Sequence, residues 1–143
     1  MSEMESASLV RIGALELNFL VDETQGRDMV VFEFLVPPNA RVPEPHFHHE
    51  VDEFIYGLEG VLTSTVDGGL KEVRSGDSLF IERGQVHHHT NLGDTPAKVL
   101  VTLQPASIGK RYFEEIGEIV NGPGKPDAEK VKALMERYGL IPA

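Results

Sequence analysis

The chain has 143 residues, the length of one ordinary domain, and its 41% hydrophobic and 25% charged residues are close to globular usage. A chain of this length and composition is neither collagen-like nor low-complexity, and it buries enough apolar surface to fold without disulfides. With 13 basic and 23 acidic residues the formal net charge is −10, which repels nucleic-acid phosphates and anionic lipids, so we expect no nucleic-acid or membrane partner.

The first eleven residues do not have the pattern of a secretory signal. They include Glu3 and Glu5, and no basic segment precedes a sustained apolar stretch. The longest apolar run covers residues 29–36 and contains Glu33, so it is far shorter than the roughly 18 residues of a membrane-spanning helix. We therefore expect a cytoplasmic protein.

Short strand-like segments separated by turns fill residues 9–103. Residues 14–21 alternate between apolar and polar side chains, which is the period of a half-buried strand. Residues 28–36 are rich in β-branched and aromatic side chains and end at two prolines, which predicts a more deeply buried strand. With roughly eight to ten such strands, the pattern favours an antiparallel sandwich or barrel.

The middle of the chain reads as a series of hairpins. Residues 53–66 hold two strand-like runs, and Asp67-Gly68-Gly69 offers the positive φ of a tight turn. Residues 70–73 should pair back across that turn. Further strand-like runs cover residues 79–81, 86–91 and 96–103.

After Pro105 the period changes to that of helices. Apolar residues fall on one helical stripe over residues 112–120 and on a second over residues 131–138, which ends at Gly139. We predict one domain over residues 1–143. Its β core covers about residues 9–104, and two helices in an extension over about residues 108–143 pack outside that core.

All six histidines lie in two short segments, residues 46–49 and 87–89. Folding alone does not require histidines to cluster in this way. His46 and His48 project from one face of a strand, about 6 to 7 Å apart, so their imidazoles can converge on one ion. Glu53 follows at the start of the next run, and the second segment, His87 to His89, adds a further imidazole once its strand lies alongside. Because the chain has no cysteine, any metal here is bound by histidine and carboxylate, a combination that suits divalent first-row ions.

The other polar residues of these segments have more ordinary explanations. His49 and His88 neighbour the candidates on a strand and point to the opposite face, so neither is assigned as a ligand. His89 shares the face of His87, but a supporting or packing role is at least as frequent as coordination. The acids nearby, Glu44, Glu50 and Asp52, are expected to be solvated.

Two stretches resemble the conserved motifs of the cupin superfamily. The first is His46-Phe47-His48-His49-Glu50-Val51-Asp52-Glu53 running on to Gly60, with a His-x-His pair, a glutamate after four residues and a glycine after six more. The second covers residues 76–91, with Gly76, Gly84, His87 and Asn91 in register. Ala40 and Glu82 depart from the motifs, at positions where glycine and proline are usual. The stretch PHFHHEVDEFIYGLEG and the tail ending in Arg137-Tyr138-Gly139-Leu140 are most similar to small single-domain bacterial cupins of the quercetin-dioxygenase-like type.

The resemblance implies an all-β cupin double-stranded β-helix, a jelly-roll barrel, whose interior holds the metal ligands His46, His48, Glu53 and His87. Four ligands on an octahedral ion leave two positions for water, dioxygen or a substrate. This favours a metal-dependent, dioxygenase-like oxidoreductase acting on a small enolic or aromatic molecule, with Glu53 as both ligand and catalytic base. The alternatives are a non-catalytic cupin that binds a metal or small ligand, and a metal-assisted isomerase, decarboxylase or lyase.

The ion, the pocket walls and the partner are expectations of the same kind. We favour iron or manganese, and nickel, cobalt, copper and zinc also fit the donors. Counting by twos along the strands turns Ile55 and His89 inward and makes Phe32 or Phe34, with Val99 or Val101, candidate walls. Arg41 is a candidate partner for a substrate carboxylate. Cupins resembling this chain commonly form dimers, so we expect a homodimer to which residues 9–21 contribute.

Overall fold

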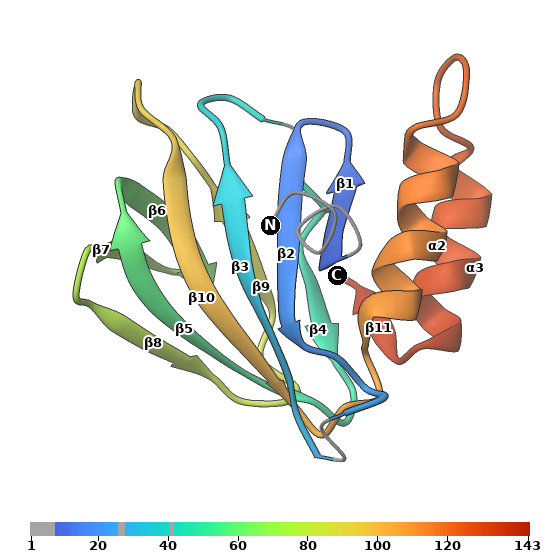
Figure 1. The fold of residues 1–143 in the computed structure, drawn as a ribbon, viewed down its shortest axis with the longest axis horizontal. Helices are drawn as coiled ribbons and strands as arrows, with labels where there is room; N and C mark the ends of the chain where they lie inside the picture. Colours follow the sequence, from blue (N-terminus) through green and yellow to red (C-terminus); the bar gives the residue numbers. More distant parts are fainter. Residues whose placement is uncertain (1–7, 26–27, 41) are drawn as a thin grey trace.

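The computed structural model describes residues 8–25, 28–40 and 42–143 and consists of two antiparallel sheets with two helices beside them (Figure 1). The larger sheet has the strand order β1-β2-β3-β10-β5-β8, and the smaller has the order β11-β4-β9-β6-β7. The strands are β1 (Leu9–Ile12), β2 (Leu15–Val21), β3 (Val30–Val36), β4 (His46–His48), β5 (Asp52–Glu59), β6 (Val61–Val66), β7 (Gly69–Arg74), β8 (Ser78–Ile81), β9 (His87–Thr90), β10 (Ala97–Gln104) and β11 (Leu140–Pro142). The helices are α2 (Lys110–Val120) and α3 (Ala128–Arg137). The predicted all-β jelly-roll architecture is confirmed, although the described strands form two sheets and not one closed barrel.

The core lies between the sheets because the strands alternate between buried and exposed side chains. In β10 every second residue from Ala97 to Leu103 is buried. Ile55 on β5 is completely buried between the neighbouring residues Val101 of β10 and Leu79 of β8. The face that carries this alternation inward also carries Glu53, two residues before Ile55, so the period of two that forms the core also places the carboxylate inside.

The hairpin predicted at Asp67-Gly68-Gly69 is confirmed. Strands β6 and β7 pair across it with Val66 opposite Gly69. Asp67 has a φ of 49° and Gly68 a φ of 83°, the two positive values that a tight two-residue hairpin turn requires.

The two C-terminal helices lie outside the strand sandwich, next to β1 and β11, as predicted (Figure 1). The Phe113 ring of α2 lies 5.3 Å from that of Phe32 and 5.8 Å from that of Phe19. Phe32, a candidate wall of the cavity, therefore packs with α2 as part of the general core. No helix in the described part of the chain combines the length and the apolar character needed to cross a membrane.

The start of each helix is fixed by a carboxylate. Glu23 accepts hydrogen bonds from the backbone N–H groups of Lys110 at 2.8 Å and Arg111 at 3.1 Å, which satisfies the first turn of α2. Asp127 is the N-cap of α3 and accepts from Glu129 and Lys130. After α3, Gly139 has a φ of 83° and lets the chain turn into β11, a strand that the sequence did not predict.

Both departures from the cupin motifs have a local explanation. In the turn after Pro37 the positive φ of 58° falls on Asn39, so position 40 does not need glycine. The backbone N–H of Glu82 donates to Oε1 of Gln85 at 2.8 Å, a hydrogen bond that proline could not make.

Asn91, the last residue of the second motif, forms hydrogen bonds that hold the loop between β9 and β10 against β3. Its side-chain amide donates to the backbone oxygens of Val36 at 2.9 Å and Thr95 at 2.8 Å, and its Oδ1 accepts from the N–H of Gly93 at 2.9 Å. The side chain therefore satisfies backbone groups of Val36, Thr95 and Gly93 and ties the loop after β9 to the end of β3.

Candidate metal centre

Four residues that the sequence singled out as metal ligands come together between the two sheets. The smaller sheet carries His46 and His48 on β4 and His87 on β9, and His46 lies directly opposite His87 in the strand register. Glu53 comes from β5 of the larger sheet. The exposed fractions of the four residues are 9%, 4%, 2% and 6%, so the cluster lies inside the molecule.

Two of the imidazoles are oriented by the backbone. Nδ1 of His46 donates to the carbonyl of Glu44 at 2.8 Å, and Nδ1 of His87 donates to the carbonyl of Gln85 at 3.0 Å. A carbonyl only accepts, so the proton of each ring lies on Nδ1 and the lone pair on Nε2. This is the arrangement in which metal-binding histidines are usually held.

One nitrogen of each of the three rings lies within 4.8 Å of the others. Nε2 of His87 is completely buried and has no hydrogen-bond partner among the described residues. A buried nitrogen with a free lone pair is costly unless another group satisfies it. A metal ion between the three rings would do so, and the residues present therefore fit a bound ion.

The carboxylate of Glu53 completes the donor set. Its Oε1 lies 3.8 Å from Nε2 of His48 and 3.5 Å from Nε2 of His87. Two ligand atoms that each lie about 2.1 Å from one ion stand about 3 to 4 Å apart, depending on the angle between them. These distances therefore suit a single ion.

The pKa shifts in the cluster keep His46 and His48 neutral and Glu53 ionised, the forms that bind a cation. Burial lowers the pKa of His46 to about 3 and that of His48 to about 4, so both rings are neutral at neutral pH and keep their lone pairs. Burial raises the pKa of Glu53, but His87 and His89 outweigh it and hold the pKa well below its usual range. Burial lowers the pKa of His87, but the adjacent carboxylate of Glu53 outweighs it and raises the pKa overall.

A further contact involves a residue that sequence reasoning did not select. His89 Nε2 lies 2.9 Å from Oε2 of Glu53, and Ser64 Oγ lies 2.8 Å from His89 Nδ1. The sequence left the role of His89 open and gave no reason to choose Ser64. The available signal was the inward face of β6, where Ser64 pairs with His89 of β9.

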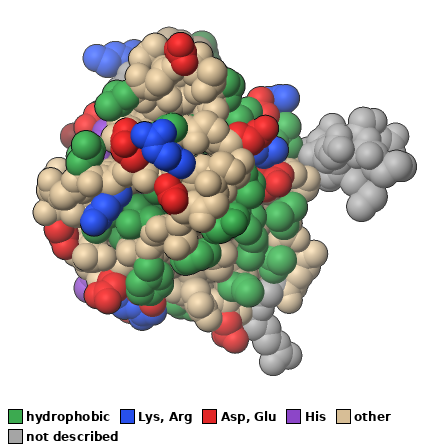
Figure 2. All heavy atoms as spheres, turned by 90° about the vertical axis from the view of Figure 1, so that its left-hand side faces the viewer, with side chains coloured by type: hydrophobic (Ala, Val, Ile, Leu, Met, Phe, Trp, Pro, Cys, Tyr) green, Lys and Arg blue, Asp and Glu red, His purple; other side chains and the backbone are tan. Residues whose placement is uncertain are grey.

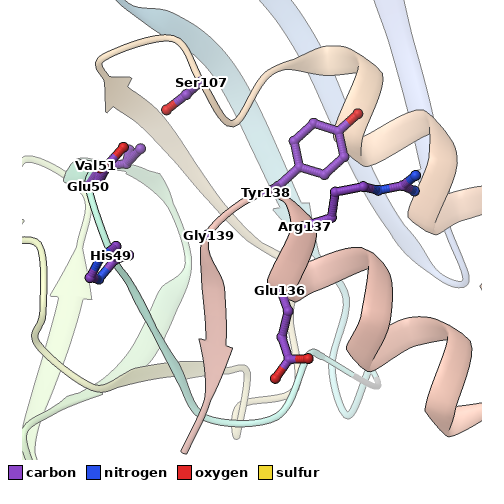
Figure 3. A pocket seen from close by; sticks show the side chains of 8 residues that line it. All are labelled: His49, Glu50, Val51, Ser107, Glu136, Arg137, Tyr138 and Gly139. Atoms are coloured by element: carbon purple, nitrogen blue, oxygen red, sulfur yellow. The ribbon is translucent and has the colours of Figure 1, made fainter.

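The remaining predicted residues are placed away from the four donors. His49 is exposed and lines a surface cavity of about 320 Å³ together with Glu50 (Figure 3). The side chains of Arg137 and Tyr138, which also line it, point away from His49 and Glu50, and Tyr138 donates to Glu115 at 2.5 Å.

Three other predictions concern Asp52, Ile55 and Arg41. Asp52, expected to be solvated, pairs with Arg83 through both carboxylate oxygens, at 3.1 Å each from the guanidinium. Ile55 is buried on the same strand face as Glu53, as predicted. Arg41 lies outside the described residues.

Comparisons with known proteins identify the family. Residues 32–103 match the family model of the cupin domain. The chain is 35% identical over 68 residues to "Tetracenomycin polyketide synthase protein TcmJ" of Streptomyces glaucescens, a match that covers 48% of this chain and 45% of that protein. It is 30% identical over 77 residues to "Probable oxidoreductase patJ" of Penicillium expansum, covering 53% of this chain and 24% of that protein.

A solved structure shows a similar fold. The sugar phosphate isomerase from a cupin superfamily of Silicibacter pomeroyi is 28% identical and superimposes with a TM-score of 0.55, covering 63% of this chain and 59% of that one. The chain spans less than half the length of each of these two curated relatives.

Proposed function

The chain belongs to the cupin family, and from that premise we propose that it is a metal-dependent oxidoreductase of the quercetin-dioxygenase-like type. Its substrate would be a small enolic or aromatic molecule. We propose that residues 1–143 act as one domain with a single centre. The likeness to an oxidoreductase-named relative supports the class of reaction.

The observation that carries the proposal is the convergence of three imidazoles and one carboxylate around the unpartnered Nε2 of His87. His46, His48, Glu53 and His87 would hold the ion. Imidazole and carboxylate together suit iron or manganese, which we favour, and also nickel, cobalt, copper and zinc. When bound, such an ion supplies a Lewis acid for a substrate oxygen and, if it is redox-active, an electron-transfer partner for dioxygen.

Glu53 has a second role in the proposal. Among the described residues it is the one carboxylate that belongs to a metal-ligating cluster, and its low pKa keeps it ionised. A substrate hydroxyl brought beside this carboxylate would meet an ionised proton acceptor. Glu53 therefore accepts the substrate proton and acts as ligand and base together.

Oxygen uptake tests this function. Iron- or manganese-loaded protein is expected to consume dioxygen with a flavonol, a catechol or another small enol, while Glu53→Gln lowers the rate by about 100-fold or more because the base is lost. Glu50→Gln is the matched control, since Glu50 is an exposed glutamate three residues away, and it should keep the wild-type rate. Full metal occupancy and full turnover in Glu53→Gln would exclude the base role.

Two alternatives give different results in the same assay. Conversion of a substrate without oxygen uptake would identify a metal-assisted isomerase, decarboxylase or lyase, the class favoured by the likeness to a sugar phosphate isomerase. Metal binding without conversion would identify a binding protein. That candidate is favoured by the burial of all four donors, at most 9% exposed, because a substrate needs access to the ion.

We also infer that the protein forms a homodimer. Figure 2 shows apolar side chains at the surface among charged ones. On the outer face of the larger sheet, Phe54 pairs with Phe80 and lies beside Tyr56, and these rings are 39%, 54% and 40% exposed. In residues 9–21, the segment expected to contribute, Leu20 is 49% exposed. A sedimentation-equilibrium mass of two chains would support the dimer, and a mass of one chain would contradict it.

A further inference from the structure

We propose that Ser64 and His89 form a hydrogen-bond relay that positions the carboxylate of Glu53, with Oε1 turned toward the three imidazoles and Oε2 held away from them. The inference deepens the proposed function and rests on it, because the relay acts on one of the four donors. His89 is then a positioning residue and not a fifth ligand.

The relay connects the two sheets through buried side chains. Ser64 on β6 and His89 on β9 are register partners within the smaller sheet, and Ser64 Oγ lies 2.8 Å from His89 Nδ1. From there His89 Nε2 reaches across to Glu53 Oε2 on the larger sheet at 2.9 Å. Ser64 is completely buried, and the side chains of His89 and Glu53 are 13% and 8% exposed.

The chemistry of the groups sets the direction of both hydrogen bonds. A carboxylate only accepts, so Nε2 of His89 must carry the proton that it donates to Glu53. A neutral ring then has its lone pair on Nδ1, which accepts from the hydroxyl of Ser64. The carboxylate of Glu53 therefore selects this tautomer, and the hydroxyl of Ser64 stabilises it by donating to Nδ1.

The consequence for Glu53 is that its two oxygens have different neighbours. Oε2 is occupied by His89, whereas Oε1 lies 3.5 Å from Nε2 of His87 and 3.8 Å from Nε2 of His48. The carboxylate is thus prepared to bind an ion through one oxygen. Without His89 the buried carboxylate is free to rotate, and the donor set loses its preset geometry.

A competing reading makes His89 itself a ligand. Glu53, His87 and His89 also form a group whose donor atoms lie within 4.8 Å of one another. In that case the imidazole of His89 would be essential, and an amide could not replace it. Substitution of His89 by glutamine and by leucine separates the two readings, because glutamine keeps an N–H donor and leucine keeps only bulk.

The first test uses the metal-free protein and nitrogen-15 NMR of the histidine rings. The relay predicts that His89 is the Nε2–H tautomer, and that Ser64→Ala increases the share of the Nδ1–H tautomer. A wild-type His89 with its proton on Nδ1 would overturn the inference whether or not the protein binds a metal.

The second test titrates Co²⁺ and records both the Kd and the visible absorption spectrum. His89→Leu is expected to bind about 10- to 100-fold more weakly with an altered spectrum, as is typical when a ligand loses its supporting hydrogen bond. His89→Gln should restore both quantities to near the wild-type values. The control is His88→Leu, the same change one position away at a half-buried ring outside the donor cluster, which should leave both unchanged.

The outcomes distinguish this inference from the function it rests on. A wild-type Kd and spectrum in His89→Leu, or a loss in His89→Gln as large as that in His89→Leu, would overturn the positioning role. If the wild type takes up no Co²⁺ while NMR finds the predicted tautomer, the relay is confirmed and the proposed metal function is contradicted.

Discussion

Replacement of His48 and His87 by alanine together is expected to lower the metal content of the purified, untagged protein from about one ion per chain to less than about a tenth. The two changes remove two of the three converging imidazoles and both nitrogens that lie next to Oε1 of Glu53. The remaining pair, His46 and Glu53, is too few donors to hold a divalent ion through purification. Elemental analysis by mass spectrometry measures the content directly.

The matched control is the double variant His49→Ala and His88→Ala. It removes two histidines from the same two segments, but neither residue belongs to a described donor cluster. We expect it to keep the wild-type metal content. Circular dichroism of both variants shows whether the fold is kept, and a full metal complement in the folded His48 and His87 variant would place the ion elsewhere.

Gly60→Ala is expected to destabilise the protein by at least about 3 kcal/mol, lowering the Tm by about 10 °C or more in thermal unfolding. Gly60 joins β5 to β6 with a φ of 65°, and a Cβ there would lie 2.2 Å from the backbone oxygen of Pro96. The start of β10 would have to move, because a backbone atom, unlike the end of a long side chain, cannot rotate away. Gly60, the glycine of the first motif, is thus required because the backbone of Pro96 leaves no room for a Cβ, and also because φ is positive.

Gly68→Ala is the control that separates these two causes. Its φ of 83° is equally unfavourable for alanine, but no atom lies within 4 Å of the added Cβ. The expected loss is therefore about 1 to 2 kcal/mol, the cost of the left-handed conformation alone. Equal losses in the two variants would contradict the role of the contact with Pro96.

The inward direction of the donors was predictable because it follows the shortest-range rule of strand structure, whereas their convergence between the two sheets was implied by the resemblance to the cupin motifs. His46 and His48 are two residues apart and therefore share a face, and the same alternation places Glu53 on the inward face of β5 with Ile55. The hairpin at Asp67 and the helical stripes are equally local patterns. The predictions of the hairpin and the helices did not depend on how the two sheets pack against each other.

The parts that sequence reasoning missed depend on long-range placement. The period of two turns Ser64 and His89 inward, but it does not say that the smaller sheet brings them to Glu53 of the larger one. Strand β11 has three residues and lies beside β4 only because α3 and Gly139 redirect the chain. The contact of Phe32, one of the candidate cavity walls, with Phe113 of α2 could likewise not be predicted from the strand pattern.

A crystal structure of the metal-loaded wild type, with anomalous diffraction measured at the absorption edge of the ion, tests the central claim most directly. The account predicts one strong anomalous peak between the two sheets, bonded to nitrogens of His46, His48 and His87 and to one oxygen of Glu53 at about 2.0 to 2.2 Å. A peak at another place in the chain, or one that leaves any of these four residues unbonded, would contradict it.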